Sequence, residues 1–137
     1  MYPPELTAPM SKELNDAGVA SLQTVSEVDQ ALGSKEGSAL VIVNSVCGCA
    51  ARNARPAVMH AMRAEKRPDQ AYTVFAGVDR EATDKARAYM RPYPPSSPSI
   101  ALFKVGRLVH MLERHHIEGA TAEMISANLT NAFEQYC

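Results

Sequence analysis

The chain has 137 residues, of which 46% are hydrophobic and 21% are charged. This is the size and composition of one folded domain, and it excludes a disordered chain. Lys and Arg number 14 against 15 Asp and Glu, the net charge is −1, and aromatic residues make up only 6%, so a nucleic-acid binder that neutralises phosphates or stacks bases is not expected.

The N-terminal residues 1–5 (Met-Tyr-Pro-Pro-Glu) lack the basic and apolar regions of a signal peptide. No run approaches the ~20 apolar residues of a membrane span. We therefore expect a cytoplasmic protein that does not enter membranes. The three cysteines are an odd number and do not make a disulfide framework, so in a reducing compartment they are catalytic, metal-binding or incidental.

The N-terminal segment, residues 1–36, is predicted to be a helical extension that packs on the rest of a single domain spanning residues 1–137. Capping residues and glycines bound two short helices there, one from Thr7 or Ser11 to Gly18 and one from Ser26 to Gly33.

A strand is predicted at residues 39–43, because this apolar run is typical of a strand buried on both faces of a sheet. Two cysteines follow it directly. Residues 50–65 have apolar side chains at helical spacing, and Pro56 within them predicts a kink or a late helix start. A second strand at 72–78 and a helix capped by Asp79 come next.

Residues 91–98 hold four of the nine prolines, which excludes a helix or a central strand there. Residues 99–103 and 108–112 read as a hairpin around a glycine turn. A last helix is capped by Thr121, and its apolar stripe consists of Ile125, Leu129, Phe133 and Tyr136. This order predicts an α/β fold with a central mixed sheet and helices on both faces.

A buried strand that leads into a cysteine pair at a helix start resembles the thioredoxin-like fold, a three-layer sandwich. Pro56 in the following helix agrees with this resemblance, as does Pro98 before the third strand, where that fold places a cis-proline against the cysteines. The chain departs from the Cys-x-x-Cys of thioredoxins, since only Gly48 separates Cys47 from Cys49.

This departure resembles a narrower family, the bacilliredoxins. The resemblance extends from about Leu6 to Cys137 and is carried by these segments: 44–50 (Asn-Ser-Val-Cys-Gly-Cys-Ala), 54–56 (Ala-Arg-Pro), 74–77 (Val-Phe-Ala-Gly), 95–99 (Pro-Ser-Ser-Pro-Ser), 114–115 (Arg-His) and 117–119 (Ile-Glu-Gly). It implies a protein that removes bacillithiol, a low-molecular-weight thiol, from S-bacillithiolated proteins. Bacillithiol is then a co-substrate and no cofactor is bound. Members are also described as weak thiol–disulfide isomerases.

Thiol–disulfide exchange needs a thiolate within reach of a disulfide sulfur. Cys47 is predicted at or just before the first helical turn, where free N–H groups and the helix dipole favour a negative charge. We therefore expect Cys47 to be the nucleophile and to be mainly thiolate at neutral pH. Gly48 is expected to permit the tight turn that a Cys47–Cys49 disulfide needs, and such a disulfide is strained and easily reduced.

Four other interpretations of the cysteine pair stay open. In the first, Cys47 and Cys49 are buried, inert residues. In the second they bind Zn or Cu(I), although the sequence has no second pair at ligand spacing and we expect no metal. In the third the protein isomerises or reduces the disulfides of proteins in general. In the fourth it is a redox-sensing or metal-handling module without turnover.

Residues outside the pair have candidate roles. A cis-Pro98 would present the backbone of Ser97 to a substrate, whereas a trans-Pro98 would only start a strand. Arg52 and Arg55, one turn apart after the cysteines, are candidates to bind the malate carboxylates of bacillithiol, or are solvated charges. Arg114 and His115 are candidates for substrate binding or proton transfer, or serve loop hydrogen bonds.

Cys137 is the final residue and is either a free thiol at a frayed end or an accessory thiol. As an accessory thiol it would resolve a mixed disulfide or bridge two chains, so both a monomer and a dimer are open.

Overall fold

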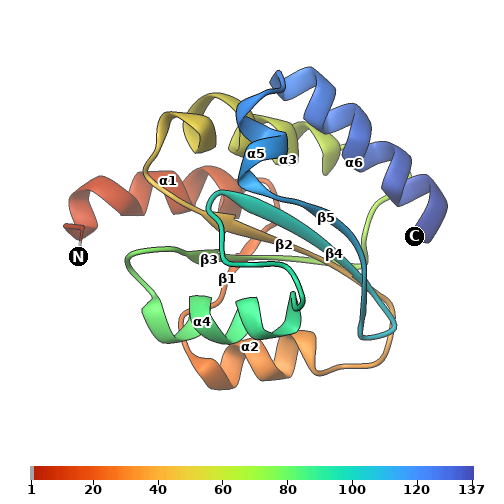
Figure 1. Ribbon diagram of the computed structural model, residues 1–137, viewed down its shortest axis with the longest axis horizontal. Coiled ribbons are helices and arrows are strands. Elements are labelled where there is room, and N and C mark those ends of the chain that lie inside the picture. Colours follow the sequence, from red (N-terminus) through yellow and green to blue (C-terminus); the bar gives the residue numbers. More distant parts are fainter. Residues whose placement is uncertain (1) are drawn as a thin grey trace.

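The computed structural model describes residues 2–137, which form a five-stranded mixed sheet with helices on both faces (Figure 1). The strands in sheet order are β1 (Ala20–Ser21), β3 (Gln70–Phe75), β2 (Ser38–Asn44), β4 (Ser99–Lys104) and β5 (Arg107–Leu112). The first three are parallel to one another, β4 is antiparallel to β2, and β5 is antiparallel to β4. The predicted α/β class and mixed sheet are confirmed.

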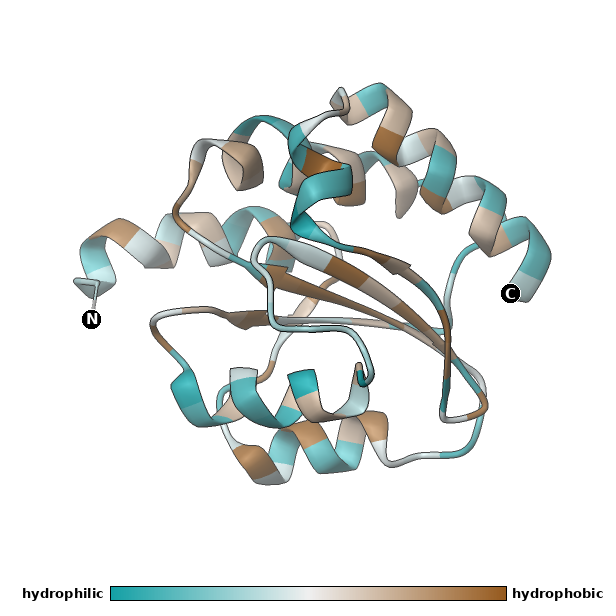
Figure 2. Cartoon of the chain, in the orientation of Figure 1, coloured by the Kyte–Doolittle hydropathy of each residue, from teal (hydrophilic) through white to brown (hydrophobic). Residues whose placement is uncertain are grey.

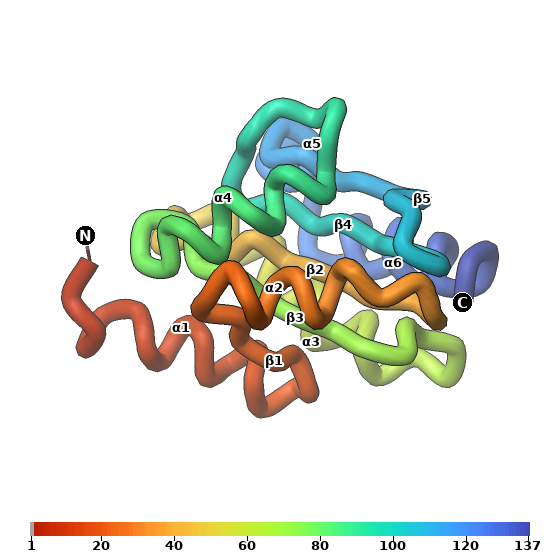
Figure 3. The backbone as a smooth tube through the Cα atoms, turned by 90° about the horizontal axis from the view of Figure 1, so that it is seen from below, coloured from red at the N-terminus to blue at the C-terminus, as the bar shows by residue number. Residues whose placement is uncertain are grey.

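The helices form two layers. One face of the sheet is covered by α1 (Pro4–Asp16), α3 (Arg55–Ala61) and α6 (Ala122–Tyr136). The other face is covered by α2 (Val25–Leu32) and α4 (Arg80–Tyr89), which lie in front of the sheet in Figure 3. The π-helical segment η1 (Ala50–Ala54) and the short helix α5 (Arg114–Glu118) lie with α3 at one end of the first layer.

Strand β2 is apolar on both faces because both faces are buried. Leu40 and Ile42 pack in the core under α1, α3 and α6, whereas Val41 and Val43 pack in the core under α2 and α4. Each of these fully buried side chains contributes about 1.5–3 kcal/mol of burial free energy. Figure 2 shows hydrophobic residues on the strands and hydrophilic ones on the outer surfaces of the helices.

The N-terminal segment differs from its prediction in three places. Helix α1 begins at Pro4, because proline is favoured in the first helical turn, and not at Thr7 or Ser11. Helix α2 is capped by Thr24, whose side chain forms a capping box with Glu27, and not by Ser26. The segment is also not purely helical, since β1 joins the sheet edge beside β3.

The central segment shows how proline and glycine set boundaries. Pro56 lies in the first turn of α3, and the π-helical η1 precedes it, which confirms the predicted late start. Strand β3 ends at Phe75 because the chain turns at Gly77, where φ is +87°. Asp79 lies at the start of α4 as predicted, but its side chain makes no capping hydrogen bond.

The C-terminal part follows the prediction more closely. β4 and β5 form the expected hairpin, and the Thr121 side chain caps α6 by accepting a hydrogen bond from the Met124 N–H. The first three residues of the predicted stripe of α6 are buried and Tyr136 is half-buried. Helix α5 was not predicted, since its five residues are mostly polar and too few to show periodicity.

Candidate active site

The cysteine pair lies where β2 leaves the sheet and the chain becomes helical. The Cys47 carbonyl accepts hydrogen bonds from the N–H groups of Ala50 and Ala51 at 3.1 and 3.2 Å, so Cys47 immediately precedes the first helical turn, as predicted. Cys47 and Cys49 are half-buried and both carry free thiols. This placement argues against the interpretation of two fully buried, inert cysteines.

Several hydrogen bonds converge on the Cys47 sulfur. Ser45 Oγ donates to Cys47 Sγ at 3.3 Å. Burial by itself raises the pKa of Cys47, but hydrogen bonds from the Ser45 hydroxyl, the N–H groups of Ala50 and Cys49, and the Cys49 thiol outweigh it and lower the pKa below the ordinary thiol value. The direction agrees with the predicted thiolate.

Cys49 is shifted in the opposite direction. Burial, the negative charge on Cys47 and the hydrogen bond to Cys47 raise the pKa of Cys49, while the Arg114 guanidinium partly offsets them. As pH rises, Cys47 therefore loses its proton first and Cys49 keeps its own as the donor between the two sulfurs. A pair whose pKa values are pushed apart in this way has two distinct chemical roles.

The loop before β4 carries a cis peptide bond between Ser97 and Pro98, as predicted. Arg114 connects this loop to the thiols. Its Nη1 donates to the Ser97 carbonyl at 3.0 Å and its Nε donates to Glu118 Oε1 at 3.2 Å. The negative charge of Cys47, followed by the hydrogen bond and charge of Glu118, raises the pKa of Arg114. Arg114 is thus an exposed cation beside the thiol pair.

The predicted role of Arg55 is wrong. Arg55 is only 3% exposed, so it is neither a solvated charge nor free to bind a substrate carboxylate. Its Nε donates to Glu13 Oε2 at 2.8 Å, and its Nη1 donates to Asn44 Oδ1 and to the Ser45 carbonyl, both at 3.0 Å. Arg55 therefore holds the chain segment that leads to Cys47 against α1.

Arg52 and Gly48 are close to each other. Arg52 is exposed, as expected for a binding or a solvated residue. Gly48 does not adopt the left-handed conformation that requires glycine. A Cβ at Gly48 would lie 2.8 Å from Arg52 Nη2, so in this free-thiol form the glycine makes room for the guanidinium.

Two positioning residues were missed in the sequence. No role was predicted for Ser45, although its hydroxyl lies only two residues before Cys47 and can therefore reach the sulfur. Asn53 on η1 donates from Nδ2 to the carbonyls of Ile117 and Ala120 at 3.0 and 2.9 Å, which fixes the end of α5 and with it the base of Arg114. Nothing local in the sequence indicates that contact.

His115 and Cys137 are not brought into the sulfur hydrogen-bond network. His115 is exposed on α5, with its ring 4.0 Å from that of His116 between centroids, and its role in proton transfer stays a prediction. Cys137 packs against the core at the end of α6. Figures 1 and 3 both place this terminus at the far end of the sheet from the end of β2, so Cys137 does not lie where it would resolve a mixed disulfide on Cys47 of the same chain.

Within residues 2–137, no group of three or more His, Cys, Asp or Glu side chains is arranged to hold a metal ion. No helix of the described chain is long and apolar enough to span a membrane.

Removal of the Ser45 hydroxyl provides a direct test of the sulfur hydrogen bond. Ser45→Ala is expected to raise the pKa of Cys47, because the largest of the hydrogen bonds that lower it is lost. At neutral pH the rate of Cys47 alkylation by iodoacetamide should fall, with about fivefold as the upper limit, the factor that corresponds to one hydrogen bond of ~1 kcal/mol. The deficit should vanish at alkaline pH, and the exposed-loop control Ser34→Ala should match the wild type at every pH. An unchanged profile for Ser45→Ala would show that the hydroxyl does not tune the thiol.

Comparisons with known proteins agree along the whole chain. A family model described as disulphide isomerase matches residues 2–137. A bacilliredoxin from Cytophaga hutchinsonii is 52% identical over 135 residues, covering 98% of this chain and 99% of that protein. Bacilliredoxins from Koribacter versatilis and Halalkalibacterium halodurans are 50% and 48% identical and cover 100% and 99% of this chain, and 94% of each relative.

Solved structures support the fold. The thioredoxin from Aeropyrum pernix superposes with a TM-score of 0.56 at 20% identity, covering 80% of this chain and 83% of that chain. Oxidised thioredoxin from Plasmodium falciparum gives a TM-score of 0.57 at 18% identity, covering 86% and 97%. With the thioredoxin-like fold, the Cys-Gly-Cys pair at the end of β2 and full-length relatives at about half identity, the chain belongs to the bacilliredoxin family of thiol–disulfide oxidoreductases.

Proposed function

We propose that this protein removes bacillithiol from S-bacillithiolated proteins, with Cys47 as the nucleophile and bacillithiol as co-substrate. The observation that carries the proposal is the Cys47 sulfur, partly exposed, held at a helix start and hydrogen-bonded by Ser45 Oγ at 3.3 Å. The full-length relatives named bacilliredoxins support the choice of thiol.

In the first step the Cys47 thiolate attacks the bacillithiol sulfur of a protein–bacillithiol disulfide. The original S–S bond breaks, a new S–S bond forms between Cys47 and bacillithiol, and the substrate cysteine leaves as a thiolate that takes a proton from water. A nucleophile with a lowered pKa is suited to this step, because the thiolate is the reactive form.

The second step restores Cys47, and two thiols compete for it. Cys49 is close enough to hydrogen-bond the Cys47 sulfur, and once deprotonated it would displace bacillithiol and form a Cys47–Cys49 disulfide. A second bacillithiol molecule would instead attack the bacillithiol sulfur that is bound to Cys47. This attack would leave bacillithiol disulfide and free Cys47. The raised pKa of Cys49 favours the second route at neutral pH.

Arg114 and the Ser97–Pro98 loop are proposed to position the substrate. Arg114 is exposed beside both sulfurs, so it stabilises negative charge as the leaving thiolate forms. Its hydrogen bond to the Ser97 carbonyl lies on the surface, where an extended substrate backbone can compete for the same loop.

The experiment uses a model protein with a single bacillithiolated cysteine. Mixed with the reduced wild-type protein, it should lose one bacillithiol mass, and the wild-type protein should transiently gain the same mass, as read by intact-mass spectrometry. The matched control carries glutathione on the same cysteine and should react more slowly. Absence of transfer from the bacillithiolated substrate would refute this function.

A second candidate function is general disulfide isomerisation, which the description of the matching family model favours. It predicts that scrambled disulfides of a model protein are reshuffled catalytically and that the reaction needs both Cys47 and Cys49. Reshuffling without bacillithiol transfer in the preceding experiment would select this function.

A further inference from the structure

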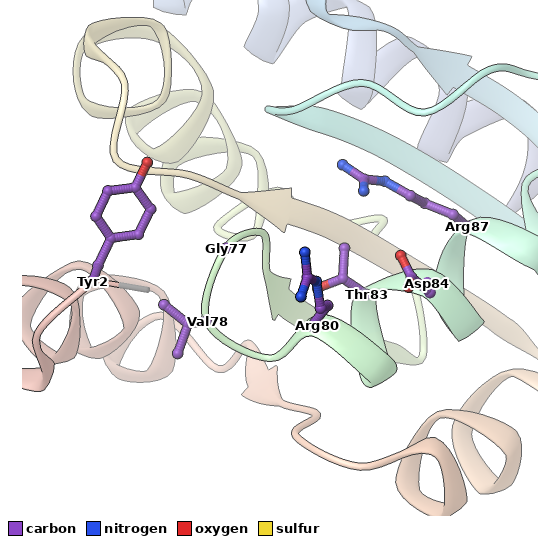
Figure 4. A pocket seen from close by; sticks show the side chains of 7 residues that line it. All are labelled: Tyr2, Gly77, Val78, Arg80, Thr83, Asp84 and Arg87. Carbon is purple, nitrogen blue, oxygen red and sulfur yellow. The ribbon is translucent and has the colours of Figure 1, made fainter.

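A cavity of about 740 Å³ opens beside the loop after β3 and helix α4 and takes no part in the chemistry described above. Its volume lies in the range of small-molecule sites, roughly 300–1,000 Å³. Figure 4 shows side chains that line it, which come from the N-terminal segment, the loop after β3 and helix α4: Tyr2, Val78, Arg80, Thr83, Asp84 and Arg87.

The two ends of the cavity are linked to the segment that leads to Cys47 and to the loop before β4. At one end Tyr2 packs on Gly77, and the adjacent Ala76 N–H donates to the Asn44 carbonyl at 3.0 Å, directly before Ser45. In Figure 4 the Tyr2 hydroxyl points toward the chain that leaves β2. At the other end Arg87 Nη2 donates to the Ser96 carbonyl at 3.4 Å, next to the Ser97–Pro98 loop.

Two buried polar atoms in this region lack partners in the described part of the chain. Thr83 is only 2% exposed, and its Oγ1 accepts or donates no hydrogen bond there. Arg87 Nε is also buried and unpaired within residues 2–137. Figure 4 shows the Thr83 side chain directed into the cavity. Buried polar groups of folded proteins are nearly always satisfied, so both atoms indicate a polar ligand.

The charges of the lining select the kind of ligand. Two arginines, Arg80 and Arg87, and one acidic residue, Asp84, line the cavity. Helix α4 begins here, and its first N–H groups, which the Asp79 side chain does not cap, attract an anion, while Glu81 in the first turn opposes part of this attraction. An arginine side chain pairs with a carboxylate through two parallel hydrogen bonds, and a carboxylate also accepts from a hydroxyl such as that of Thr83.

We propose that this cavity binds the carboxylate-bearing end of the low-molecular-weight thiol whose sulfur reacts with Cys47, with Arg80, Arg87 and Thr83 as its ligands. The proposal rests on the proposed function for the identity of that thiol. It assigns the carboxylate contacts to α4, whereas the sequence had suggested Arg52 and Arg55. The site would select an anionic thiol over a neutral one, while the sulfur chemistry stays with the cysteines.

The first experiment measures binding without reaction. S-methyl bacillithiol, which cannot exchange, is titrated into the reduced protein and followed by amide NMR shifts. Shifts should concentrate in residues 77–87. Arg87→Met should weaken the affinity about tenfold or more, the effect of losing a charge-assisted hydrogen bond. Arg107→Met, which removes an exposed arginine from the first position of β5, should bind as the wild type does.

Thr83→Val is a second variant that keeps the test valid if Arg87→Met does not fold. It keeps the shape of the side chain and removes a hydroxyl that has no partner, so the fold should keep its stability while the affinity falls severalfold. Equal affinity in wild type, Arg87→Met and Thr83→Val, or shifts confined to residues outside 77–87, would overturn the proposal.

Kinetics separate this proposal from the proposed function. Reduced protein is reacted with bacillithiol disulfide and with the neutral hydroxyethyl disulfide. Arg87→Met should slow the first reaction about tenfold more than the second, and Thr83→Val should show the same preference more weakly. If the wild type binds S-methyl bacillithiol at residues 77–87 but exchanges with neither disulfide, the function fails and the cavity proposal stands. If both variants exchange like the wild type and bind equally, the cavity proposal fails and the function stands.

Discussion

Cys47→Ala is expected to abolish bacillithiol transfer, leaving only the background of uncatalysed thiol exchange. Cys47 combines the features that the attack requires: a partly exposed sulfur, a lowered pKa and a hydrogen bond from the Ser45 hydroxyl. Cys49 does not replace it, because burial, the largest cause of its raised pKa, persists in the variant and keeps the Cys49 thiol protonated at neutral pH. Intact-mass spectrometry of the variant after mixing with a bacillithiolated model protein should show no gain of mass.

Cys49→Ala gives the complementary result. It should still accept one bacillithiol, more slowly by up to about fivefold, because Cys47 loses one hydrogen bond of ~1 kcal/mol. The adduct should persist when no free bacillithiol is present, since the internal resolving thiol is gone. Cys137→Ser is the matched control with a cysteine removed at the far end of the sheet, and it should transfer like the wild type. Bacillithiol accumulating on Cys49 in the Cys47→Ala protein would reverse the two roles.

Elements with a strong local signal were predictable from the sequence. The apolar run of β2 indicated a strand buried on both faces because Leu40 and Val41 belong to opposite cores. Pro56 marked the start of α3 because a proline has no N–H to donate in a helix interior. β1 was not predictable, since its two residues are a strand only through pairing with Tyr72 and Thr73, about 50 residues away by sequence position.

The candidate site divides along the same line. Cys47 and Cys49 were identified because the cysteine pair and the strand before it are local features. The sequence also places Arg55 in the helical stretch after the cysteines. The direction of its side chain, however, depends on Glu13 of α1, 42 residues earlier. A sequence pattern gives the helical face of a residue only when neighbouring residues show a clear periodicity, and the π-helical turns of η1 shift that face just before Arg55.

Through the buried Arg55, helix α1 supports the segment that carries Cys47. From the sequence, the residues before the sheet were predicted to be only an extension. In the structure, Glu13 of α1 accepts a hydrogen bond from Arg55, and the Met10 carbonyl accepts one from Asn44. Asn44 Oδ1 in turn accepts from the Ser45 N–H at 2.9 Å. A series of hydrogen bonds that begins on α1 therefore fixes the segment that leads to Cys47.

Arg55→Met tests this chain and should lower the free energy of unfolding by about 2–4 kcal/mol. The Ser45 carbonyl loses its side-chain donor in a buried position, whereas Glu13, 49% exposed, is solvated once the arginine is gone. Ser45 should then lose its fixed position, the pKa of Cys47 should rise, and exchange at neutral pH should slow. Urea unfolding measures the first effect, and the pH profile of Cys47 alkylation measures the second.

Two comparisons separate positioning from loss of fold. Arg52→Met removes an exposed arginine from the same helical stretch and should change stability by no more than about 0.5 kcal/mol. Arg55→Lys keeps the charge but loses the fork that reaches Glu13 and Asn44 together, so it should restore stability only in part. If Arg55→Met slows exchange equally at neutral and alkaline pH, the arginine supports the fold without tuning the thiol. A slowing confined to neutral pH, recovered as Cys47 is ionised by base, makes Arg55 the residue through which α1 controls the nucleophile.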